Sequence, residues 1–164
     1  MVHAVSLALS APLLEERVDD YVEDVCRLLP GVRTRWHSDA AHLTFFFEPG
    51  QERVESLLRR AADAVRQKLA QAVILEAGPD LLPLSTIDEL VGLPRGSLEK
   101  LREGYPESFP REAFHSASLW HLTHVLRWIR AVGAIQVDTT LLDIAGACEQ
   151  FNALLRAQRP WRVA

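Results

Sequence analysis

Apolar and polar residues follow two different periods along the first half of the chain. Residues 3–10 alternate, with Val5, Leu7 and Leu9 on one side, as in a half-buried strand. A helical period follows, in which apolar residues recur every three or four positions. The remaining predicted elements of this half are a helix, the two arms of a hairpin, a second helix and a fourth strand, over residues 13–29, 32–36, 42–47, 54–69 and 72–78.

The order strand, helix, strand, strand, helix, strand is typical of a ferredoxin-like βαββαβ domain, in which both helices cover one face of an antiparallel sheet. Phe46 lies in opposite phase to Phe45 and Phe47, so its ring is expected on the uncovered face. An apolar ring on that face needs a cover. The sequence is equally consistent with two covers, the second half of the same chain and a second copy in a homodimer.

The segment PLSTIDELVGLPRGSLEKL has the pattern of two short amphipathic helices joined by a tight turn. The first is predicted over residues 85–91, capped by Ser85 or Thr86, with Asp88 in the first turn, where the helix dipole favours negative charge. The second is predicted from Pro94 to Gly104, because proline suits the first position of a helix. The apolar side chains expected to join the two helices are Ile87, Leu90, Leu98 and Leu101.

Two such helices on a shared apolar core form a helix-turn-helix, whose second helix presents its N-terminal residues to the major groove. A loop or small hairpin over 109–120 is expected to act as a wing on the phosphate backbone, and Trp120 to belong to the core. The candidate DNA-binding residues are Arg95, Ser97 and Lys100 for bases or phosphates, and Arg102, Arg111 and His115 for the backbone.

The C-terminal part of the chain carries one more amphipathic helix, over residues 138–158, with Asp138 as its N-cap. Its apolar side is expected to fold back on the chain itself or to pair with a second subunit. The predicted fold is therefore α+β, with a ferredoxin-like domain at 1–80, a winged helix-turn-helix domain at 81–133 and a C-terminal helix within 134–164.

Charge limits the kinds of nucleic-acid binding that this chain can perform. Its formal net charge is −4, and residues 81–133 hold six basic and six acidic side chains. Because nonspecific affinity for DNA comes mainly from neutralised phosphates, any DNA contact must come from a local patch. The chain of 164 residues has no apolar run long enough to cross a bilayer, and the opening MVHAVSLALSAP lacks the basic start of a signal peptide, so we expect a soluble, cytoplasmic protein.

Residues that could carry catalysis or hold a metal are sparse. His121 and His124 lack a third ligand at a recognisable spacing, and the two cysteines, Cys26 and Cys148, are expected to be free, buried thiols. The sequence contains no glycine-rich phosphate loop and no nucleophile with an evident base. We expect no metal and no cofactor, and an enzyme is the weakest hypothesis.

The second half also resembles a known family. The segments EAGPDLLPLSTIDELVGLPRGSLEKL, SASLWHLTHVLRWIRA and LLDIAGACEQFN are similar to those of bacterial small DNA-binding proteins that join a ferredoxin-like half to an excisionase/MerR-like winged helix-turn-helix. In that family the turn and the start of the reading helix resemble Ser-Arg-Gln-Asn, which aligns here with residues 94–97, where Arg95 alone is kept. The resemblance implies a DNA-binding regulator.

Two functions of different classes remain open from the sequence. The first is a transcriptional regulator that binds double-stranded DNA as a homodimer, because two copies would double the phosphate contacts. The second is an adaptor that has lost DNA reading and binds a protein partner through aromatic surfaces such as Phe46 on the open sheet face, Trp36 or Trp161. The balanced charge of residues 81–133 favours the second.

Overall fold

The computed structural model describes residues 3–10, 17–38, 41–48, 50, 52–114 and 117–158. These ranges form a mixed α+β fold with six helices, a four-stranded antiparallel sheet and a two-stranded one. The chain divides into two compact units, one comprising 1–78 together with 147–164 and the other comprising 79–146. No helix in the described ranges is long and apolar enough to cross a membrane.

The first unit is built on four strands in the order β2-β3-β1-β4, with every neighbouring pair antiparallel. The two central strands place Val5 opposite Phe45 and Leu7 opposite Leu43, and these four side chains are buried on one face. The alternating apolar residues thus lie on one buried face of the sheet, and the residues between them lie on the other face. The four predicted strands are confirmed. They are β1 (His3–Leu9), β2 (Arg33–His37), β3 (His42–Phe47) and β4 (Ile74–Gly78).

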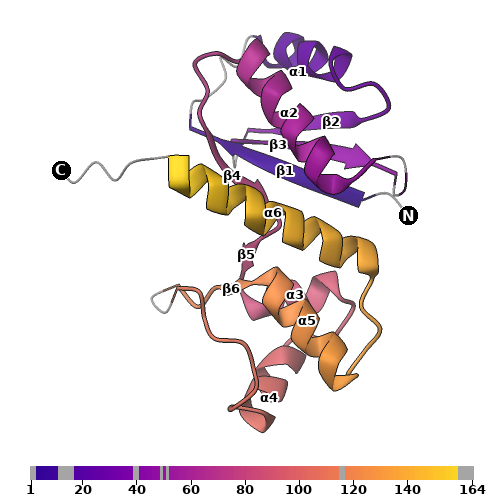
Figure 1. Ribbon diagram of the computed structural model, residues 1–164, viewed down its shortest axis with the longest axis vertical. Coiled ribbons are helices and arrows are strands. Elements are labelled where there is room, and N and C mark those ends of the chain that lie inside the picture. The colour runs from indigo at the N-terminus through magenta and orange to yellow at the C-terminus, as the bar shows by residue number, and fades with distance from the viewer. Residues whose placement is uncertain are drawn as a thin grey trace, which may run out of the picture. The chain divides into compact units, whose positions relative to one another are not determined.

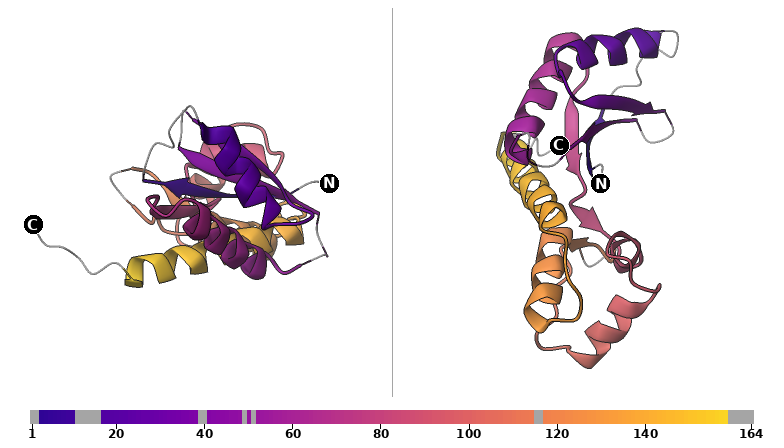
Figure 2. Two further views of the ribbon diagram at one scale, coloured as in Figure 1. Left: turned by 90° about the horizontal axis from the view of Figure 1, so that it is seen from above. Right: turned by 90° about the vertical axis from the view of Figure 1, so that its right-hand side faces the viewer.

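Two helices, α1 (Val18–Arg27) and α2 (Val54–Lys68), contact each other and lie on the same side of this sheet (Figures 1 and 2). Helix α2 is amphipathic, and its apolar side, including Leu57, Ala61 and Val65, is buried. Both predicted helices are confirmed, although residues 13–16 of the first prediction lie outside the described residues.

Phe46 lies on the opposite face of the sheet, as its phase predicts. Side chains of the adjacent strand lie against its ring. The guanidinium carbons of Arg33 and Arg35 lie 5.9 and 5.7 Å from the centre of the ring. Cross-strand register accounts for this contact, because Arg33 pairs directly with Phe46.

Helix α6 (Thr139–Gln158) begins where the sequence predicts, with the Asp138 carboxylate accepting the backbone N–H of Thr140 at 2.8 Å. Its residues from 147 onward belong to the first unit. There the buried amide of Asn152 donates to the Ala77 carbonyl at 2.9 Å and accepts from the Ala77 N–H at 2.7 Å. Because β4 is an edge strand, Asn152 pairs backbone groups that no neighbouring strand reaches.

Asn152→Ala is expected to lower the free energy of unfolding by about 2 kcal/mol, because it leaves the backbone groups of Ala77 buried without this partner. Chemical denaturation followed by circular dichroism measures the loss. The control is Ala153→Gly, whose neighbouring site is exposed and which costs only about 1 kcal/mol through helix propensity. An Asn152→Ala loss no larger than that of the control would contradict the bonding role of the amide.

The second unit packs three helices and a two-stranded sheet around one apolar cluster. Its sheet pairs β5 (Leu81–Leu82) with β6 (Trp120–His121), and the helices are α3 (Leu84–Leu90), α4 (Ser97–Gly104) and α5 (Leu122–Val132). Trp120, which is 1 % exposed, lies in the cluster, as predicted. The other largest buried members come from all three helices and are Leu84, Ile87, Leu98, Leu122 and Leu126.

Candidate nucleic-acid interface

The connection between α3 and α4 is held by one buried carboxylate. Asp88 is 0 % exposed, and its two oxygens accept the backbone N–H groups of Gly96 at 2.7 Å and Leu98 at 3.0 Å. Its own carbonyl accepts the N–H of Leu93 at 2.8 Å. Asp88 therefore fixes the turn and caps the N-terminus of α4 from the preceding helix, where a negative charge also suits the helix dipole.

This bonding corrects the predicted start of the second helix. Helix α4 begins at Ser97 and not at Pro94, and Gly96 precedes it in the left-handed region with φ 83°. Only glycine adopts that conformation at little cost, and it lets the chain turn under the carboxylate of Asp88. Arg95 consequently lies in the turn and not within the helix.

The first helix also differs from the prediction. It begins at Leu84 after Pro83, and neither serine nor threonine caps it with a side-chain hydrogen bond. Asp88 therefore lies one turn further into α3 than expected. Leu90 is 45 % exposed, so it does not join the shared core, whereas Ile87 and Leu98 do.

The three residues predicted to approach bases lie together at the turn and the start of α4. Arg95 and Lys100 are exposed, and Ser97 is partly exposed. The Ser97 hydroxyl donates to the Pro94 carbonyl at 2.5 Å, so it closes the turn. The two cations are thus better placed than the hydroxyl to meet a phosphate or a base edge.

Arg102 is engaged within the unit. Its guanidinium lies 2.8 Å from the Glu99 carboxylate and 3.4 Å from that of Glu112, and it stands 5.5 Å from the centre of the Trp120 ring. These contacts tie the end of α4 to the segment before β6. Arg102 therefore acts first as a cross-link, a role that the sequence did not reveal because Glu112 is ten residues away.

The segment expected to form a wing contains a short antiparallel bridge between Phe114 and Leu119, and the Ala113 N–H donates to the Leu119 carbonyl at 2.8 Å. Arg111 is exposed just before this bridge. His115 lies outside the described residues. A concavity of about 330 Å³ separates the base of the segment from the end of α4, and Arg102, Arg111 and Trp120 are among its lining residues.

The two histidines that follow this segment, His121 and His124, contact neighbouring side chains of the second unit. His121 Nδ1 lies 2.7 Å from a carboxylate oxygen of buried Asp80, and the His121 and His124 rings are 5.0 Å apart. In the described part of the chain, no three His, Cys, Asp or Glu side chains gather as a metal site would require. Cys148 is buried and Cys26 is only partly buried, and the two do not form a disulfide with each other.

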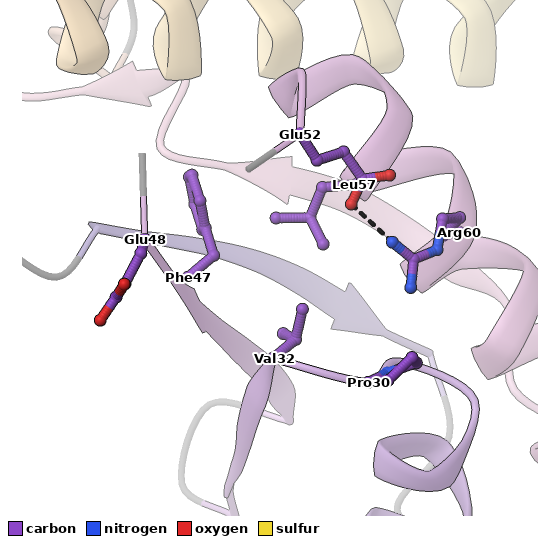
Figure 3. Close-up of a pocket in the computed structure, with 7 residues that line it drawn as sticks. All are labelled: Pro30, Val32, Phe47, Glu48, Glu52, Leu57 and Arg60. Carbon is purple, nitrogen blue, oxygen red and sulfur yellow. Dashed lines mark hydrogen bonds and ion pairs between the residues drawn. The ribbon is translucent and has the colours of Figure 1, made fainter. Parts of the chain in front are cut away.

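The first unit has an open pocket of about 360 Å³ beside the end of β3 (Figure 3). Its apolar wall includes Phe47 and Leu57, and its polar wall carries an ion pair of 2.6 Å between Glu52 and Arg60. Since Glu52 already neutralises the pocket's arginine, the arrangement is poorly suited to an anionic ligand.

Comparisons of this chain with protein-family models, with curated proteins and with solved structures found no match.

Proposed function

We propose that the chain is a DNA-binding regulatory protein in which α3 and α4 act as a helix-turn-helix on duplex DNA. The observation that carries the proposal is the Asp88 clamp, which holds two short helices at a fixed turn and leaves Arg95 and Lys100 exposed at the leading end of the second. In a helix-turn-helix, the residues at that end meet base edges in the major groove.

Two further features support this assignment. The antiparallel bridge between Phe114 and Leu119 suits a wing, with Arg111 exposed just before it for a phosphate contact. In the first unit, the strand order β2-β3-β1-β4 with α1 and α2 on one face suits the ferredoxin-like half of the proposed architecture. We further propose that a homodimer binds a two-fold-symmetric site, which would double the few phosphate contacts of one copy.

Arg95→Ala is expected to weaken binding to duplex DNA by more than about 1 kcal/mol, because it removes the foremost cation of the turn. Fluorescence polarisation of a labelled random-sequence duplex at low salt measures the change. The matched control is Arg66→Ala, which removes one exposed charge from α2 in the other unit. Equal affinity of the two variants, or unfolding of Arg95→Ala, would contradict the assigned role.

A second candidate function is an adaptor that binds a protein partner. The ion pairs of Arg102 favour it. Two carboxylates already neutralise this side chain, so it offers less to a phosphate. Exposed Glu89, Glu103 and Glu107 further lower the potential around α4. Under this hypothesis the Arg95→Ala variant would bind duplex DNA no less well than the parent protein, because neither would bind it specifically.

A further inference from the structure

The uncovered face of the first unit's sheet carries a compact group of cationic and aromatic side chains on two adjacent strands. Cross-strand pairing sets Arg33 beside Phe46, Arg35 beside Thr44 and His37 beside His42. We call this group the basic sheet face, and its members are Arg33, Arg35, His37, His42, Thr44 and Phe46. Helices α1 and α2 lie on the other side of the sheet (Figure 2).

Phe46 forms the base on which the two guanidinium groups rest. Arg33 and Arg35 are exposed, and their guanidinium carbons lie 5.9 and 5.7 Å from the centre of its ring. Within the described part of the chain, neither arginine forms an ion pair with a carboxylate. Two permanent charges are thus held close together by a ring and remain available to an incoming anion.

The histidine pair adds a second flat surface on the same face. The rings of His37 and His42 are stacked, with centroids 4.4 Å apart and an angle of 16° between their planes. On the neighbouring central strand, Ala4 and Ala8 stand opposite Phe46 and His42. Because alanine side chains are short, a ligand can approach both sets of rings from the β1 side.

The charge of this face is opposite to that of the chain. The four strands of the sheet carry Glu76 as their one carboxylate, which pairs with Ala8 on this same face, against the two arginines of the basic sheet face. The whole chain has a formal net charge of −4. A local cationic patch attracts an anionic partner by charge complementarity. The acidic remainder of the protein repels the same partner, so binding is confined to the patch.

We propose that the basic sheet face binds single-stranded nucleic acid. Its arginines would hold successive phosphates, and its rings would stack on bases, which a single strand exposes and a duplex keeps covered. A sheet face with aromatic side chains offers both contacts at once. An acidic peptide would satisfy the arginines but would leave the stacking surfaces of Phe46 and the histidines unused, so the combination favours nucleic acid.

The test is fluorescence polarisation of the full chain with labelled 12-nucleotide single strands of DNA and of RNA at low salt. We expect the double variant R33A/R35A to bind about tenfold more weakly than the parent. Phe46→Leu keeps an apolar side chain and is expected to bind about fivefold more weakly, because it removes the stacking ring. The charge-matched control R59A/R66A, on exposed positions of α2, is expected to bind within about twofold of the parent.

This proposal stands apart from the duplex-binding function. Arg95→Ala should leave single-strand binding unchanged, whereas R33A/R35A should leave binding to the duplex unchanged. Circular dichroism first verifies that each variant is folded.

Four results would overturn the single-strand proposal. The first is that the parent protein does not bind single strands, and the second is that R59A/R66A loses as much affinity as R33A/R35A. The third is that polyglutamate of equal charge displaces the strand completely. The fourth is that the parent protein sediments as a dimer and that R33A/R35A sediments as a monomer. The last two would assign the face to an acidic peptide or to a second copy.

Discussion

Trp120→Ala is expected to lower the free energy of unfolding of the second unit by about 3 to 5 kcal/mol. The ring is 1 % exposed within the apolar cluster, so its removal leaves a cavity that neighbouring helices cannot fill. The substitution also removes the donor that binds the Pro110 carbonyl at 3.2 Å and the surface under the Arg102 guanidinium. It therefore loosens the attachment of the segment around Pro110 as well as the core.

Denaturant unfolding followed by far-UV circular dichroism measures this loss without depending on the fluorescence of the deleted ring. Trp120→Phe keeps most of the apolar volume and is expected to recover much of the stability. Phe114→Ala removes an aromatic ring that is 52 % exposed, and it should cost less than about 1 kcal/mol. A Trp120→Ala variant as stable as Phe114→Ala would show that the ring is not a core residue.

Asp88→Ala is expected to cost about 3 to 4 kcal/mol, because two charge-assisted hydrogen bonds are lost and two backbone donors remain without their acceptor. Since those donors set the start of α4, the variant should also lose duplex binding in conditions where it is still folded. Polarisation at low temperature separates the binding loss from the loss of stability.

Two further variants sharpen the test of Asp88. Asp88→Asn retains one acceptor oxygen and is expected to recover part of the stability. Glu89→Ala removes the adjacent, exposed carboxylate and should change the free energy of unfolding by no more than about 0.5 kcal/mol. If Asp88→Ala were as mild as Glu89→Ala, the turn would be held by packing and not by the carboxylate.

Most regular elements were predictable from the sequence because their periodicity is strong. The strand at residues 3–10 and helix α2 each have one dominant apolar face. Only one orientation of each element buries that face, so the orientation follows from the sequence. The N-cap of α6 was equally visible, because Asp138 lies just ahead of the apolar repeat that starts at Leu141. These features depend on residues close together in the chain.

The errors arose where distant or irregular contacts decide the structure. Local capping preferences placed the start of α4 at Pro94, but a carboxylate of α3 and the positive φ of Gly96 decide it. The contact of Arg33 and Arg35 with Phe46 depends on a cross-strand register that periodicity does not give. The bond between Asn152 and Ala77 joins residues 75 positions apart, beyond any helical or strand pattern.

The candidate interface was predictable in part. Sequence singled out the exposed cations Arg95, Lys100 and Arg111, but it also assigned a DNA contact to Arg102. The ion pairs of Arg102 with Glu99 and Glu112 require the fold to bring α4 and the following segment together. The sequence therefore shows which residues are cationic, but it does not show which of them are already held in ion pairs.

The most direct test of the proposed function is selection from a pool of random-sequence duplexes at about 50 and about 200 mM salt, followed by sequencing of the bound fraction. We predict enrichment of a short, two-fold-symmetric motif, with affinity that falls steeply between the two salts and is lost in Arg95→Ala. Absence of any enriched duplex at both salts would contradict the assignment of α3 and α4 as a DNA-reading helix-turn-helix.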